Sequence, residues 1–141
     1  MDLSIIVFSV FIGIIFLALF VRDEYHVGKK RLDNVFDGRA NLTYSEFHEK
    51  YFKELGVDLA IVEGVRSIFE EQFDADMSRL SSEDDFSRNL SFLWAWDSMA
   101  DVEIVNQLEE KFHINITDSE AEQAHTVRDI VLLVSRKVKN A

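Results

Sequence analysis

Residues 97–134 have the sequence DSMADVEIVNQLEEKFHINITDSEAEQAHTVRDIVLLV, and this stretch decides the fold. Apolar side chains recur every three or four positions in two separate runs, which is the spacing of amphipathic helices. Asp97 or Ser98 is placed to cap the first helix and Thr126 to cap the last, with a short acidic helix expected over residues 118–124. The apolar face of the first helix is predicted to contain Met99, Val102, Val105, Leu108 and Phe112.

Upstream of this stretch, the chain has the signals of two more helices. Thr43 and Glu46 have the spacing of a capping box, which predicts a short helix that Gly56 stops. Asp58 is expected to cap a helix of about four turns. The apolar face of that helix should contain Ile61, Val62, Val65, Ile68, Phe69 and Phe73, with Glu63, Arg66, Glu70 and Glu71 opposite.

Residues 74–96 break the helical pattern. The carboxylates of residues 74–85 lack the glycine and glutamate positions of a calcium-binding EF-hand loop, so a solvated loop is expected there. Phe86 and Leu90 are predicted to enter the core. The chain has no proline and only five glycines, which favours an all-α fold.

The N-terminal residues 3–21, LSIIVFSVFIGIIFLALFV, carry no charge. As a helix they would span about 28 Å, close to the hydrocarbon thickness of a bilayer. A signal peptide is the alternative, but the chain starts Met1-Asp2 without basic residues and lacks a good cleavage site. Residues 22–42 lack a sustained periodicity and are predicted to be a juxtamembrane linker, which would let the domain swing beside the membrane if it is flexible. The basic residues after the span predict a single-pass membrane protein with its N-terminus outside and its soluble domain cytoplasmic; they are Arg22, Lys29, Lys30 and Arg31.

Charge and composition exclude several classes of function. The net charge of −11 makes nucleic acid a poor partner, because phosphate binding needs basic surface. The absence of cysteine excludes disulfides, thiolate nucleophiles and cysteine-ligated zinc. The four histidines are dispersed, and no glycine-rich phosphate loop or serine nucleophile elbow occurs. We therefore predict no metal site and no enzymatic activity.

An ordered series of motifs in the second half of the chain resembles the acyl carrier protein family. The resemblance covers about residues 61–137 and is most specific between Asp97 and Val127. In order, the matching elements are the Asp97-Ser98-Met99 triplet, residues 102–105 (VEIV), residues 108–110 (LEE), Phe112, residues 114–116, the acidic residues 118–122 and Thr126-Val127.

The resemblance implies a cofactor. Family members carry 4'-phosphopantetheine on the serine of the triplet, and its terminal thiol holds acyl groups as thioesters. Ser98 is the matching residue, flanked by Asp97 and Met99. A phosphate at a helix N-terminus is also favoured by unpaired backbone N–H groups and the helix dipole. The alternative for Ser98 is that it is only a helix cap.

The resemblance also implies partners. They are a phosphopantetheinyl transferase and, given the apolar span, a membrane-associated acyltransferase or synthase with a basic docking patch. An acyl chain is expected to enter the core between Met99, Val105 and the last helix. The acidic residues expected to face the partners are Asp101, Glu103, Glu109 and Glu110.

Residues 91–96 depart from the family pattern. Family members have about two residues between the loop leucine and the Asp-Ser pair, whereas this chain has six, including Phe92, Trp94 and Trp96. These aromatics either extend the core or face outward as a platform for the membrane or a partner.

Together, the sequence predicts an all-α protein: an acyl-carrier-like four-helix bundle with one extra preceding helix and an N-terminal transmembrane helix. Its predicted divisions are residues 1–21 (anchor), 22–42 (linker), 43–57 (additional helix) and 58–141 (bundle). The leading hypothesis is a membrane-tethered acyl carrier with its arm on Ser98. An acidic adaptor of the same fold, which recruits or regulates a membrane enzyme, and a small structural subunit of a membrane complex remain as alternatives.

Overall fold

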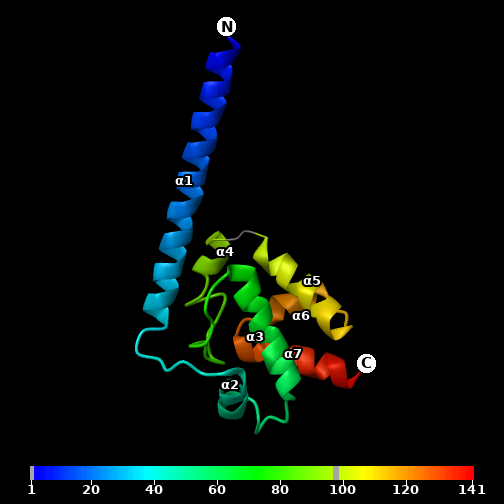
Figure 1. Ribbon diagram of the computed structural model, residues 1–141. Coiled ribbons are helices and arrows are strands. Elements are labelled where there is room, and N and C mark those ends of the chain that lie inside the picture. The colour runs from blue at the N-terminus through cyan, green and yellow to red at the C-terminus, as the bar shows by residue number, and fades with distance from the viewer. Residues whose placement is uncertain (1, 97–98) are drawn as a thin grey trace.

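The computed structural model describes residues 2–96 and 99–141, and in those residues it contains seven helices and no β-strand. The predicted all-α class is confirmed. Figure 1 shows α1 projecting as a long rod from a compact group formed by the other helices. The helices are α1 (Leu3–Val35), α2 (Tyr44–Tyr51), α3 (Leu59–Phe73), α4 (Phe92–Trp96), α5 (Ala100–Phe112), α6 (Asp118–Gln123) and α7 (Val127–Lys139).

The compact part is built around α3, which packs against α2, α5 and α7. Its predicted apolar side chains are buried, among them Val62, Val65 and Phe69. Gly64 lies directly against α5, where a Cβ atom would come within 2.5 Å of the Phe112 ring. The absence of a side chain at Gly64 therefore allows α3 and α5 to approach closely.

Capping explains where several helices begin. The predicted capping box at Thr43 and Glu46 opens α2, and the predicted cap at Thr126 opens α7. A further capping box at Thr117 opens α6. Helix α5 begins at Ala100 with Met99 in the N-cap position, one residue later than the latest predicted cap.

The buried face of α5 differs from the predicted one. Met99 and Val102 are about half exposed, at 56% and 49%. Of the other predicted residues, Leu108 is buried, and Val105 and Phe112 are partly buried against the core. The fully buried side chains of α5 are spaced by four residues and are Ala100, Ile104 and Leu108. A spacing of three, as in the predicted series, drifts around a helix with 3.6 residues per turn, so that series does not stay on one face.

Residues 22–42, predicted as a linker, are helical over their first two thirds and do not have the flexibility that a linker could have there. Helix α1 continues without interruption through Val35, and we call its residues 22–35 the stalk. Leu32 and Phe36 are buried, and together with Tyr25 and Gly28 they recur at intervals of three or four residues. This face packs on the rest of the domain, and that contact stabilises helix in a stretch that is otherwise charged.

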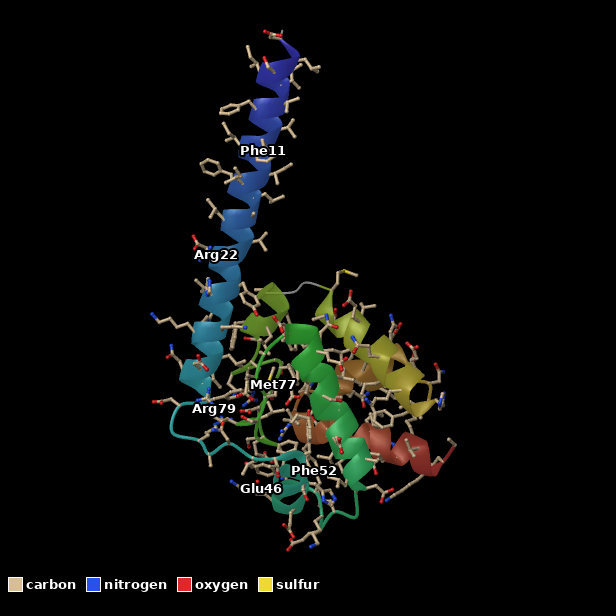
Figure 2. The ribbon with its side chains drawn as sticks, in the orientation of Figure 1. Phe11, Arg22, Glu46, Phe52, Met77 and Arg79 are labelled. Atoms are coloured by element: carbon tan, nitrogen blue, oxygen red, sulfur yellow. The ribbon has the colours of Figure 1, made fainter. Side chains whose placement is uncertain are left out.

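Polar contacts also join the stalk to the domain. Arg79 Nη2 lies 2.7 Å from Asp33 Oδ1, and the Tyr25 hydroxyl donates to Asp74 Oδ2 at 2.6 Å. Two guanidinium groups lie near the centre of the Phe36 ring, that of Arg39 at 5.3 Å and that of Arg79 at 5.6 Å. Figure 2 shows Arg79 beside the C-terminal end of α1, on the side of the domain nearest the helix.

Helix α2 covers a charged residue of α3. Arg66, expected on the polar face, is only 4% exposed. Its Nη1 donates to the Leu42 carbonyl at 2.9 Å, and its guanidinium lies 4.2 Å from the centre of the Tyr44 ring. The Tyr44 hydroxyl donates to Glu70 at 2.6 Å, and this bond raises the pKa of Tyr44 to about 12.

The segment between α3 and α4 is not a solvated loop. Its apolar residues Met77 and Leu80 are buried, and so are two polar residues, Ser82 and Asp84. The prediction that Phe86 and Leu90 enter the core is confirmed.

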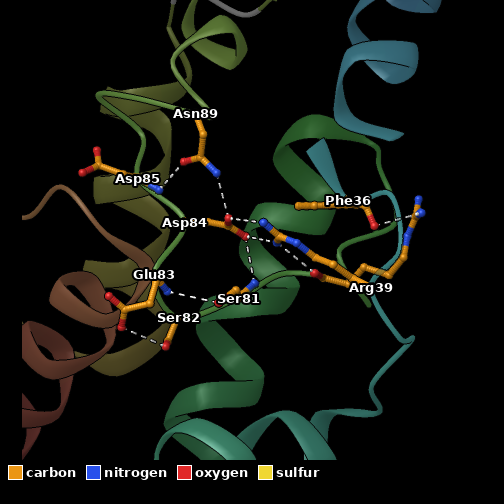
Figure 3. A network of polar contacts seen from close by, with 9 residues as sticks. Phe36, Arg39, Ser81, Ser82, Glu83, Asp84, Asp85 and Asn89 are labelled. Carbon is orange, nitrogen blue, oxygen red and sulfur yellow. Dashed lines mark hydrogen bonds and ion pairs between the residues drawn. The ribbon is translucent and has the colours of Figure 1, made fainter. Parts of the chain in front are cut away.

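Asp84 lies at the centre of a network of polar contacts, drawn in Figure 3. Both of its carboxylate oxygens accept from Arg39, at 2.8 and 3.0 Å. They also accept from the backbone N–H of Ser81 and the side-chain amide of Asn89, each at 2.8 Å. The Asp84 carbonyl accepts from the N–H of Val127 at 3.0 Å. One buried residue therefore ties the segment after α1 to the loop and to the start of α7.

We predict that Arg39→Ala or Asp84→Ala lowers the free energy of unfolding by about 3 kcal/mol, because each change leaves a largely buried ion pair without one partner. Denaturant unfolding of the detergent-solubilised chain measures this loss. Glu83→Ala is the control: its carboxylate is mostly exposed and pairs with Arg128 at the surface, so the loss should stay below about 1 kcal/mol. Equal losses in all three variants would contradict a special role for Asp84.

Candidate functional site

The predicted attachment site falls between α4 and α5. Figure 1 shows α4 and the first turn of α5 at the end of the domain that faces the N-terminal part of α1. Asp97, Ser98 and the side chain of Trp96 lie outside the described part of the structure. The role of Ser98 therefore stays a prediction, and its surroundings are judged from the residues on either side.

The start of α5 is open to solvent. Met99, in the N-cap position, is 56% exposed and its side chain makes no capping hydrogen bond. Helix α5 has 13 residues, so its N-terminal dipole and unpaired N–H groups favour an anion at this end. An exposed position next to a helix N-terminus fits a phosphodiester on the residue before Met99.

The four predicted docking residues differ in their surroundings. Asp101, Glu103 and Glu110 are exposed, whereas Glu109 is half-buried. Glu103 accepts a hydrogen bond from Gln72 of α3 at 2.8 Å. Glu109 accepts the backbone N–H of Ile116 at 2.8 Å, which holds the turn between α5 and α6. Three of the four carboxylates are thus exposed, while Glu103 and Glu109 each also make a hydrogen bond inside the domain.

An open pocket of about 470 Å³ lies between α5, α6 and α7. Ile104, Val105 and Leu108 line it from α5, and small side chains, Ala121 and Ala124, line it from α6 and the turn that follows. The predicted site for an acyl chain named Val105 and the last helix, and both belong to this pocket. Met99, the third residue named, does not line it.

The wall formed by α6 is fastened to α7. Lys137 Nζ lies 2.7 Å from Glu120 Oε1, and both side chains are about a quarter exposed. The Lys137 ammonium and the Thr117 backbone N–H lower the pKa of Glu120. This pair joins α6, which forms one wall of the pocket, to α7.

The aromatics of residues 91–96 make contacts inside the molecule. The Trp94 ring lies 5.3 Å from that of Phe86 and 6.2 Å from that of Phe73, and it lines the pocket. Phe92 is half-buried, with the Arg31 guanidinium of the stalk 4.9 Å from its ring centre. These contacts favour the alternative in which Phe92 and Trp94 extend the core.

Comparison with known proteins fits this arrangement. A family model described as the phosphopantetheine attachment site matches residues 63–134. This chain belongs to the phosphopantetheine-binding carrier protein family. Proteins of this family are non-catalytic carriers, so the prediction that the chain is not an enzyme is confirmed, as is its phosphopantetheine cofactor. We call α3–α7 the carrier domain.

Individual relatives show how much of the chain is shared. The acyl carrier protein of Thermosynechococcus vestitus is 35% identical over 78 residues, which are 55% of this chain and 91% of that protein. That of Helicobacter hepaticus is 39% identical over 72 residues, or 51% of this chain and 90% of that protein. That of Guillardia theta is 36% identical over 78 residues, or 55% and 91%. Residues 1–62, which include α1 and α2, lie outside the family match.

The two adjacent glutamates of α5 give a paired prediction. Glu109→Ala should lower the free energy of unfolding by about 1–2 kcal/mol, because the Ile116 N–H loses a charged acceptor. Glu110→Ala should change the free energy of unfolding by less than about 0.5 kcal/mol. The Glu110 side chain is exposed and makes no hydrogen bond or ion pair to the described residues. Denaturant unfolding compares the two. Equal effects would contradict the structural role of Glu109.

Proposed function

We propose that this chain is a membrane-tethered acyl carrier protein whose 4'-phosphopantetheine is attached to Ser98. The observation that supports this most is the family match over residues 63–134, which includes Ser98. The exposed start of α5 supports it as well, because that position leaves room for a group on residue 98. The prosthetic group supplies a thiol for thioester chemistry, which the cysteine-free chain lacks.

The surroundings of the attachment point suggest how a partner recognises it. Asp101, Glu103 and Glu110 are exposed acidic residues along α5, and Met99 and Val102 add exposed apolar area between them. A transferase or synthase with a basic patch and an apolar spot would complement this surface. Glu109 contributes charge there but also holds the α5–α6 turn.

The pocket beside α5 fits an apolar chain. Its lining is mainly aliphatic, and a volume of about 470 Å³ lies within the range of small-molecule sites. We expect an acyl group carried near Ser98 to be sheltered there from water. The burial of that apolar surface would stabilise the loaded carrier.

The N-terminal helix supports the membrane part of the proposal. Within the described residues, one helix, Leu3–Val35, is long and apolar enough to cross a membrane; a signal sequence passes the same test. Helix α1 runs unbroken from the apolar residues into the buried Leu32, so the segment behaves as part of the folded unit. The basic residues of the stalk favour an N-terminus outside and the carrier domain in the cytoplasm. Tethering raises the effective concentration of the carrier at a membrane-associated acyltransferase or synthase.

Intact mass spectrometry tests the attachment site. Chain purified from its own host should carry the mass of one phosphopantetheine, and Ser98→Ala should lose it. Ser119→Ala, at an exposed serine of α6, should keep it. Wild-type protein that stays unmodified, also after treatment with a broad-specificity phosphopantetheinyl transferase, would contradict the proposal and favour the acidic adaptor.

Charge reversal tests the docking surface. Glu110→Lys should slow modification by a phosphopantetheinyl transferase about tenfold, because like charge on a basic partner costs on the order of 1.4 kcal/mol in the encounter. Glu54→Lys, exposed and remote from α5, is the control with the same change in charge. The initial rate of modification is the measurement. A similar rate for both variants would contradict docking through α5.

A further inference from the structure

The stalk, which lies outside the family match, contacts α4, which lies in the stretch that departs from the family pattern. The stalk lies N-terminal to the matched residues. Helix α4 lies within residues 91–96, the six residues before Asp97 that stand where family members have about two. The stalk and α4 meet where the Arg31 guanidinium lies 4.9 Å from the centre of the Phe92 ring. The insertion thus fills the space between the stalk and the core of the carrier domain.

The stalk is fixed at more than one point along its length. Tyr25 bonds to Asp74 near its beginning, and Leu32 and Phe36 are buried near its end. Tyr25 and Phe36 are 11 residues apart, or about 16 Å along a helix. Contacts at both ends of such a length determine the angle between helix and domain, so the stalk is not a hinge.

The orientation that results is visible in the figures. In Figure 1, α4 and the start of α5 lie at the end of the domain nearest the apolar part of α1, and α2 lies at the opposite end. Figure 2 shows Phe11 and Arg22 on the projecting helix, with Glu46 and Phe52 at the far end of the domain. Arg31, beside α4, follows the last apolar residue of the span, Val21, by ten residues, or about 15 Å of helix.

We propose that the stalk is a rigid spacer that turns the attachment end of the carrier domain toward the bilayer. This inference rests on the membrane tethering and on the Ser98 attachment proposed above. A rigid stalk would hold the carried group close to the lipid headgroups, whereas a flexible linker would let the carrier domain turn in any direction. The partner it fits is a membrane-embedded enzyme whose active site opens at the same membrane surface.

Depth measurements in vesicles test this orientation on the full chain. Because the chain has no cysteine, Ala95→Cys in α4 and Ser45→Cys in α2 each provide a single exposed labelling site. A fluorophore is attached at either position, and phosphatidylcholine vesicles carry a nitroxide quencher on the lipid headgroup. Quenching at position 95 should be severalfold stronger than at position 45. Equal quenching, or stronger quenching at position 45, would overturn the proposal.

A change in stalk length provides a second arm. Seven alanines inserted after Asp23 should lengthen the stalk by about 10 Å and nearly keep its helical phase. Since the docked part of the stalk follows the insertion, the domain keeps its contacts, and quenching at position 95 should fall toward that at position 45. Unchanged quenching at position 95 would contradict the spacer role.

Two further measurements distinguish a failure of this inference from a failure of the proposed membrane tethering or of the proposed attachment at Ser98. Vesicle flotation reports tethering: a chain that does not float with vesicles contradicts both the anchor and the orientation. A chain that floats but shows equal quenching contradicts the orientation alone. The presence of phosphopantetheine on Ser98 is read from the intact mass and is independent of both results.

Discussion

The ion pair between Arg39 and the buried Asp84 joins the segment after α1 to the loop before α4. A carboxylate that is 2% exposed is costly unless donors surround it. Asp84 receives four hydrogen bonds, from Arg39, Ser81 and Asn89. The Asp84 hydrogen bond also holds the pKa of Arg39 above its usual value. These donors come from the segment after α1 and from both sides of the loop, so folding the loop and docking the stalk satisfy the same buried charge.

This arrangement gives the carrier domain a fixed relation to the N-terminal helix. The loop held by Asp84 leads into Leu90 and then α4, whose residues pack on one side against Phe86 and on the other against the stalk. Helix α5 follows at once with its exposed start. Helix α4, on one side of Ser98, is therefore positioned by the stalk, whereas α5, on the other side, packs against α3 and α7. Helix α1, residues 91–96 and the carrier domain form one unit, and the acidic residues Asp101, Glu103 and Glu110 of α5 stay exposed.

Much of this could be predicted from local signals in the sequence. The helices were predicted from the capping box at Thr43, the cap at Thr126 and the periodicity of α3. The family was predicted from the motif series that begins at Asp97. The stalk was missed because its buried face comes from four scattered residues among charged ones, and its helix is stabilised by contacts far along the chain. The role of Asp84 had no local signal, since Arg39 lies 45 residues away. The phase of α5 was misjudged because a three-residue repeat drifts around the helix.

Hydrogen exchange tests the central claim that the stalk and the carrier domain fold as one unit. In the full chain in detergent, backbone amides of residues 29–36 should be protected as strongly as those in the middle of α3. In Arg39→Ala, protection should fall together in residues 29–36 and in the loop at residues 80–90, because both depend on Asp84. Rapid exchange of the stalk in the wild-type chain, with α3 still protected, would show a flexible tether and contradict the account.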